Sequence, residues 1–101
     1  MPERSFITIE DIERVHRLFT TRHALSILDG LRRGLEPAAA VPDRTGPRKI
    51  RKALAVLAEW QLVNVEPAID APAESRLVTL TPKGARFATL LDDLCHDRDS
   101  E

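Results

Sequence analysis

The residues best suited to chemistry in this chain are five cations between positions 44 and 52, with no acidic residue among them. An Arg guanidinium can bind a guanine edge or a phosphate through two parallel hydrogen bonds, whereas a Lys ammonium acts mainly as a charge toward phosphate. The stretch therefore predicts contact with a polyanion rather than catalysis. The cations are Arg44, Arg48, Lys49, Arg51 and Lys52.

A second set of reactive side chains, His16, His23, Cys95 and His96, raises the alternatives of a metal sensor and a redox switch. Asp92 and His96 are spaced by one helical turn, but two candidate ligands are fewer than a closed metal site needs. The lone cysteine excludes an internal disulfide, and its acidic neighbours disfavour a reactive thiolate. We expect no metal, no cofactor, a buried or half-buried apolar role for Cys95, and His23 packed beside a helix.

No sequence motif of an enzyme accompanies these residues. The chain has no Gly-x-Ser-x-Gly, no phosphate-binding loop and no pair of carboxylates on a recognisable scaffold. The sequence therefore predicts a protein that is not an enzyme.

The element that must carry the basic stretch is an amphipathic helix from about residue 46 to 60. Gly46 and Pro47 suit a helix start, because proline at the first helical position loses no useful N–H and its φ is already helical. Ile50, Leu54 and Leu57 recur at helical spacing and form one inward stripe, which leaves the cations outside it. We expect Trp60 to fill the joint between this helix and a hairpin, in preference to lining a ligand pocket.

Periodicity predicts the other elements and their order. An N-cap at Thr8 and an apolar repeat predict a helix over about 9–19, and a second repeat ending at Gly34 predicts one over 22–32. Two prolines limit the segment 35–42 to a short helix of about a turn and a half. Alternation predicts strands at 62–65 and 77–81, joined by a long loop, before a last helix capped by Thr81 and beginning at Pro82.

Length and charge set the frame for these elements. We expect the 101 residues to form a single domain, 1–101, with an ordered core over 8–94 and frayed ends at 1–6 and 96–101. The formal net charge of −1 gives no general attraction to nucleic acid, so binding must rest on the uneven distribution of charge. The sequence lacks a secretory pattern and a run of roughly 20 apolar residues, which favours a cytoplasmic protein with no membrane span.

The last predicted helix carries more apolar surface than one small domain can bury. We therefore expect it to pair with a second subunit in a homodimer. The residues expected at the dimer interface are Phe87, Leu90, Leu91 and Leu94.

The order of these elements is that of a winged helix-turn-helix: mainly α with a small β-hairpin. Three segments resemble HxlR-type transcriptional regulators, with PadR and MarR types as near relations. They are Leu-Ser-Ile-Leu-Asp-Gly-Leu at 25–31, Gly-Pro-Arg-Lys-Ile-Arg-Lys-Ala-Leu-Ala-Val-Leu-Ala-Glu-Trp-Gln-Leu-Val at 46–63, and Val-Thr-Leu-Thr-Pro-Lys-Gly at 78–84. The resemblance implies a dimeric repressor that binds double-stranded DNA at a pseudo-palindromic operator.

The resemblance also implies which residues touch DNA. Arg48, Lys49, Arg51 and Lys52 match positions placed in or beside the major groove, while Arg44 and Thr45 are expected at a phosphate. The predicted wing is acidic at three positions and carries one cation, Arg76, as its candidate contact. That acidic wing and the near-neutral charge favour an alternative, a winged-helix protein–protein interaction module that has lost DNA binding.

Overall fold

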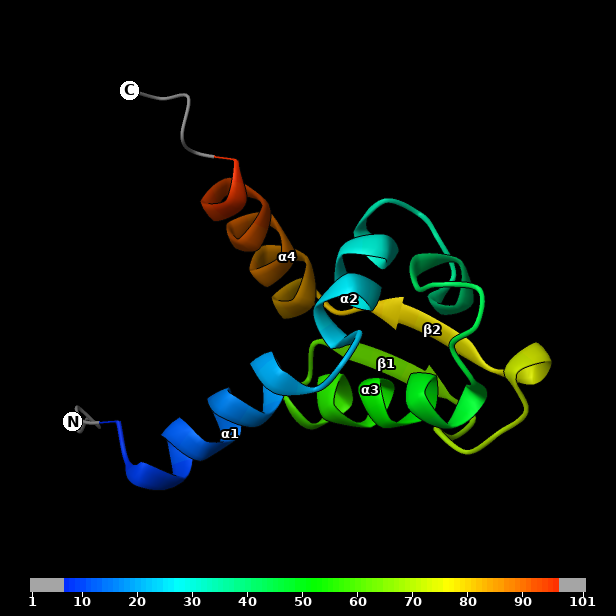
Figure 1. Cartoon of the computed structure of the whole chain (residues 1–101), viewed down its shortest axis with the longest axis horizontal. Coiled ribbons are helices and arrows are strands. Elements are labelled where there is room, and N and C mark those ends of the chain that lie inside the picture. The colour runs from blue at the N-terminus through cyan, green and yellow to red at the C-terminus, as the bar shows by residue number, and fades with distance from the viewer. Residues whose placement is uncertain (1–6, 97–101) are drawn as a thin grey trace.

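The computed structural model describes residues 7–96, which are mainly helical with one antiparallel hairpin, an arrangement compatible with a winged helix (Figure 1). This confirms the predicted class of a mainly α domain with a small hairpin. The elements in chain order are α1 (Ile9–Thr20), α2 (Ala24–Arg32), the 3₁₀ helix η1 (Pro37–Ala40), α3 (Pro47–Glu59), β1 (Val63–Glu66), the 3₁₀ helix η2 (Ala73–Ser75), β2 (Leu77–Leu80) and α4 (Pro82–Cys95).

Two helices begin at the threonine caps expected from the sequence. The Thr8 hydroxyl accepts a hydrogen bond from the Asp11 N–H, and the Asp11 carboxylate accepts one from the Thr8 N–H, each at 3.0 Å. The Thr81 hydroxyl accepts from the Gly84 N–H at 2.9 Å and donates to the Gln61 carbonyl at 2.7 Å. Thr81 therefore caps α4 and also ties it to the chain just before β1.

The second helix begins two residues later than predicted and ends at Arg32, as predicted, shortly before Gly34. His23 adopts a left-handed backbone with φ of 73°, so the helical repeat cannot start before Ala24. Gly34, with φ of 86°, follows the helix, and the Leu35 N–H bonds back to the Gly30 carbonyl at 2.8 Å. The predicted short helix between the prolines is a single 3₁₀ turn, as the two prolines allow.

The hairpin pairs β1 with β2 in antiparallel register, with Val63 opposite Leu80 and Glu66 opposite Leu77. Both ends of β1 lie one residue later than predicted, whereas β2 begins at the predicted residue and ends one residue earlier. The loop between the strands, residues 67–76, holds η2 and projects at the far side of the molecule from α1 and α4 (Figure 1).

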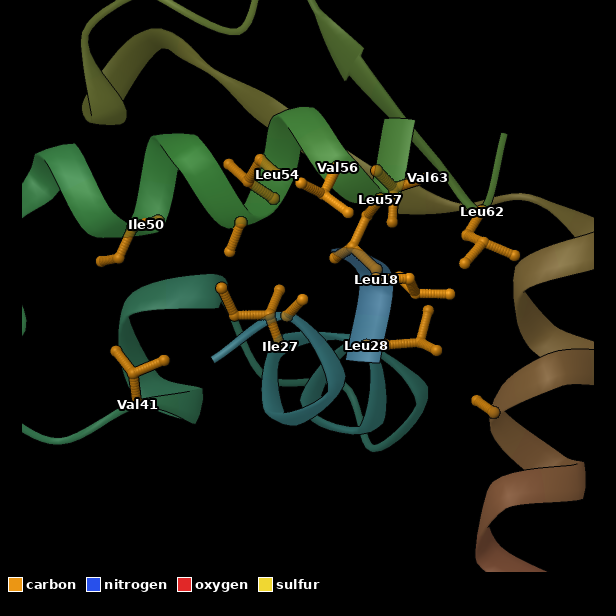
Figure 2. Packing of buried hydrophobic residues seen from close by; sticks show 13 residues of the cluster. Leu18, Ile27, Leu28, Val41, Ile50, Leu54, Val56, Leu57, Leu62 and Val63 are labelled. Atoms are coloured by element: carbon orange, nitrogen blue, oxygen red, sulfur yellow. The ribbon is translucent and has the colours of Figure 1, made fainter. Parts of the chain in front are cut away.

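The core lies between α2 and α3, whose apolar side chains face one another (Figure 2). Ile27 and Leu28 from α2, and Leu54 and Leu57 from α3, are its largest fully buried side chains. The predicted inward stripe of α3 is confirmed, because Ile50 is buried as well. The helix that carries the basic residues is therefore fixed along its whole length.

The last helix approaches the hairpin closely at Gly84. A Cβ added to this glycine would overlap the carbonyl oxygen of Leu62, so only glycine fits without moving the backbone. One turn later Ala88 is buried against the core. Small residues thus set how closely α4 lies on the rest of the domain.

Beyond these contacts, α1 and α4 both extend from the same side of the body toward the two ends of the chain (Figure 1). Within residues 7–96, no helix is long and apolar enough to cross a membrane. Of the predicted frayed ends, 1–6 and 96–101, residues 1–6 and 97–101 lie outside the described residues. His96 is described, and its N–H bonds to the Asp92 carbonyl at 3.0 Å.

Candidate nucleic-acid interface

The basic stretch occupies the first half of α3 and the turn before it. Arg48, Lys49 and Lys52 are exposed and Arg51 is half-buried, while the inward stripe holds the opposite face of the helix on the core. Arg44 is exposed in the turn that precedes α3. The structure thus brings all five predicted cations to one end of one rigid helix.

These cations have no acidic partner in the part of the chain that the structure describes. The ion pairs there involve Arg14, Arg17, Arg32, Arg33 and His96, none of which belongs to the basic stretch. Because the described acidic residues of α4 lie on a helix that points away from α3, they do not cover the stretch (Figure 1). Among residues 7–96, the positive charge of the stretch is therefore not neutralised by an ion pair.

The position of these cations also lowers the stability of the helix that carries them. A helix N-terminus carries partial positive charge, so Arg48 and Lys49 in the first turn of α3 oppose the helix dipole. The N-cap residue is Gly46, and no side chain caps the free N–H groups of this end. A bound anion would relieve both effects.

The first helix shows the opposite arrangement and makes the contrast clear. Its first turn holds Glu10 and Asp11, its last turn holds Arg17, and a capping box closes its N-terminus. All three features stabilise an isolated helix. The charges of α3 are therefore not explained by helix stability.

At the other end of α3, Glu59 joins the helix to α1. Its carboxylate accepts hydrogen bonds from Arg17 at 2.7 Å and from Arg14 at 3.4 Å. The hydrogen bond from Arg17, followed by the charges of both guanidinium groups, lowers the pKa of Glu59 below its usual value. The Arg14 guanidinium also lies 4.3 Å from the centre of the Trp60 ring. Glu59 lies 42 positions from Arg17 and 45 positions from Arg14 in the sequence, so helical spacing does not predict these two contacts.

Arg76, the cation predicted at the wing, is turned inward on its own loop. Its guanidinium donates to the carbonyls of Ile69 at 3.0 Å and Ala71 at 3.3 Å, and the residue is half-buried. Both bonds are donated by one guanidinium nitrogen, Nη1, which ties the side chain to its own loop. Arg76 therefore belongs to the loop between the strands rather than to the basic stretch of α3.

The four predicted interface residues on α4 fall into two pairs. Phe87 and Leu91 are half-buried and pack against the core, whereas Leu90 and Leu94 are 64% and 76% exposed. The helix α1 is not among the elements predicted to form this surface. Its apolar face is nevertheless open, and includes Ile9, Ile12, Val15 and Phe19.

One sequence prediction about this end of α4 is wrong. Cys95 is exposed rather than buried or half-buried, because the last turn of α4 extends beyond the core. Nearby, the His96 Nδ1 lies 3.1 Å from an Asp92 carboxylate oxygen, and that carboxylate also pairs with Arg32 at 3.4 Å. Within residues 7–96, no three His, Cys, Asp or Glu side chains are grouped as a metal site requires.

His23 and Trp60 lie near the places expected for them. His23 is half-buried at the start of α2. Trp60 packs on the core at the end of α3, but it is half-buried rather than enclosed.

Comparison with known proteins adds no relative: no protein-family model, curated protein or solved structure matches the chain.

Proposed function

We propose that the chain is a winged helix-turn-helix DNA-binding transcriptional regulator that docks α3 against the major groove. The observation that carries the proposal is a cluster of cations that form no ion pair within residues 7–96. They lie at an uncapped helix N-terminus and are held outward by a buried apolar stripe. A duplex offers phosphates to the helix N-terminus and guanine edges to the guanidinium groups. Arg48 and Arg51 are the proposed base or phosphate contacts, with Lys49 and Lys52 supplying charge.

The geometry of α3 suits this role. Its 13 residues give a rod about 20 Å long, and an α-helix fits the width of the major groove. Arg44 and Thr45 precede the helix and would approach the phosphate backbone at its N-terminal end. Arg76 is left out of the proposed surface, because its guanidinium donates hydrogen bonds to carbonyl groups of its own loop.

The exposed apolar faces of α1 and α4 support a homodimer. Single exposed apolar residues are ordinary on a protein surface, but here Val15 and Phe19 on α1 line the same hollow as Leu90 on α4. A symmetric pair would present two copies of α3 to half-sites roughly 34 Å apart, one turn of B-DNA. The HxlR-type resemblance of the α2, α3 and β2–α4 segments supports the same assembly on a pseudo-palindromic operator, with repression by occlusion as the simplest outcome.

The salt dependence of duplex binding tests the proposal directly. If four to six phosphates are neutralised, the logarithm of the association constant should fall with the logarithm of salt concentration at a slope of roughly −4 to −5. Fluorescence anisotropy with a labelled duplex from a genomic selection would measure it. Absence of duplex binding even at low salt would reject DNA as the partner.

A matched pair of double variants assigns the binding to α3. Arg48→Ala with Arg51→Ala should weaken duplex binding at least about 100-fold and flatten the salt slope by about 2, with little change in thermal stability. Arg22→Ala with Arg33→Ala removes the same charge from exposed positions elsewhere and should leave binding within about threefold. Equal losses in the two variants would place the DNA surface outside α3.

The second candidate is a protein–protein interaction module that keeps the fold without binding DNA. It is favoured by the wing, where Glu66 and Glu74 are exposed and the guanidinium of Arg76 is occupied by loop carbonyls. Such a module would show no duplex affinity at low salt. It would still associate through the apolar faces of α1 and α4.

A further inference from the structure

A small recess lies where α1, α4 and the end of α3 meet. It has a volume of about 310 Å³, at the lower end of the range of small-molecule sites. Its apolar wall comes from Val15, Leu18, Phe19, Trp60, Leu62, Phe87 and Leu90, and the rings of Phe19 and Phe87 meet edge to face at 6.3 Å.

The charge at the recess is of one sign. Lys83 and Arg86 line it, and no acidic residue does. Neither cation forms an ion pair within residues 7–96, although the Lys83 ammonium lies 5.8 Å from the centre of the Trp60 ring. An apolar hollow bordered by two unpaired cations attracts a molecule that is apolar over most of its surface and carries one negative charge.

We propose that this recess binds a small apolar monoanion, such as a monocarboxylate with a ring or short alkyl body. The body would pack on Trp60 and Phe87, and the carboxylate would lie at Lys83 and Arg86. The indole N–H of Trp60 is buried and finds no hydrogen-bond acceptor in the part of the chain described. Because this nitrogen is closed to solvent, the proposed carboxylate is bound by Lys83 and Arg86 alone.

The recess is distinct from the exposed ends of the proposed dimer surface. Leu18 and Leu62, which form part of its wall, are buried in the core, whereas Leu94 and Ile12 do not line it. The two regions share four residues: Val15, Phe19, Phe87 and Leu90. The competing occupant is therefore a side chain of a second copy, and the experiment must separate the two.

Trp60 makes the site directly measurable. It is the only tryptophan, and the chain has no tyrosine, so the intrinsic fluorescence excited at tryptophan wavelengths comes from the wall of the recess. The full chain is titrated, below micelle-forming concentrations, with octanoate, 2-naphthoate, 1-octanol and octylammonium. Saturable spectral change is expected with at least one of the two anions, with affinity at least about fivefold above that of 1-octanol and of octylammonium.

Three variants locate the binding. Arg86→Gln should weaken the bound anion about 5- to 10-fold and leave 1-octanol unchanged, whereas Arg22→Gln, which removes an exposed charge outside the recess, should change neither. Val15→Phe fills the recess from a half-exposed position and should abolish binding of both the anion and the alcohol. Circular dichroism checks that each variant is folded.

None of these measurements uses DNA, so their outcomes test ligand binding at the recess independently of the proposed regulatory function. Failure of both anions to bind, or equal binding of octanoate and 1-octanol that Arg86→Gln does not alter, would overturn it. Binding to a Leu94→Asp monomer but not to the wild type would show that a second copy fills the recess, and would overturn it as well.

Discussion

The body of the domain and its two terminal helices bury their apolar residues to very different extents. α3 buries five residues, including Leu54 and Leu57, against α2 and the hairpin. α1 buries Leu18 alone, and α4 buries Gly84 and Ala88. Most of the exposed large apolar side chains in residues 7–96 lie on α1, just before it, or on α4.

This difference shows which parts of the sequence the fold of one chain accounts for. The apolar pattern of α2 and α3 is fully used in forming a core, and their outward residues are free to be basic. The apolar pattern of α1 and α4 is used only in part, because each helix presents a face that its own chain leaves open. We propose that association with a second copy, rather than folding, accounts for that surplus.

The largest expected effect separates the two regions with one kind of substitution. Leu54→Ala removes a fully buried side chain and should lower the free energy of unfolding by about 3 kcal/mol. Leu94→Ala removes a side chain that is 76% exposed and should change it by less than about 0.5 kcal/mol in the monomer. Urea unfolding at concentrations that keep the chain monomeric measures both. Similar losses would contradict the contrast.

The next effect concerns association alone. Leu90→Asp places a charge on the open face of α4 and should raise the dimer dissociation constant at least about 100-fold, equivalent to about 2.7 kcal/mol. Thr89→Asp adds the same charge one residue earlier, about 100° around the helix, and should leave dimerisation nearly intact. Sedimentation equilibrium would report both. A wild-type chain that stays monomeric at tens of micromolar would remove the proposed interface.

A smaller effect compares how the two terminal helices are fixed to the body. Thr81→Ala removes the cap of α4 and also the bond to the Gln61 carbonyl, and should cost about 1.5 kcal/mol. Thr8→Ala removes a cap at the exposed start of α1 and should cost about 0.5 kcal/mol. Thermal unfolding of the two variants gives the order. A larger loss for Thr8→Ala would mean that α1 is the more firmly attached helix.

The smallest effect is electrostatic and depends on pH. Arg17 and Arg14 lower the pKa of Glu59, so this carboxylate stabilises the folded chain above its ordinary pKa and loses that contribution as it is protonated in acid. Glu59→Gln should therefore reduce stability slightly at about pH 7, and by less at about pH 3. Glu74→Gln, exposed on the wing, is the control. A loss that does not change with pH would assign the effect to packing.

Local chemistry made most of the elements predictable from sequence. Thr8, Thr81 and Pro47 start helices where caps and a first-turn proline predict, and the spacing of Ile50 and Leu54 correctly gives the buried face of α3. The start of α2 was misplaced, since nothing in the sequence marks the left-handed backbone at His23. Exposure of Cys95 was missed because helical periodicity gives a face but not how far the core extends along it.

Long-range contacts were the part that sequence could not supply. The pairing of Glu59 with Arg17 joins residues 42 positions apart, and Arg76 could only be read as a free cation until its loop carbonyls were located. The recess depends on how α1 and α4 diverge, which no periodicity encodes. The basic end of α3 could be predicted because the run of cations, the signals for the helix start and the apolar stripe all lie within one short stretch of sequence.

Gly84 has a consequence for the proposed assembly that goes beyond packing. Because any Cβ at this position meets the Leu62 carbonyl, a Gly84→Ala substitution must push α4 outward and change its tilt on the hairpin. In the proposed dimer, α4 connects each domain to its partner. A small rotation of α4 at Gly84 would therefore produce a larger displacement of the N-terminal end of α3 relative to the other subunit. The spacing between the two half-sites that the dimer can bind would then depend on the absence of a side chain at position 84.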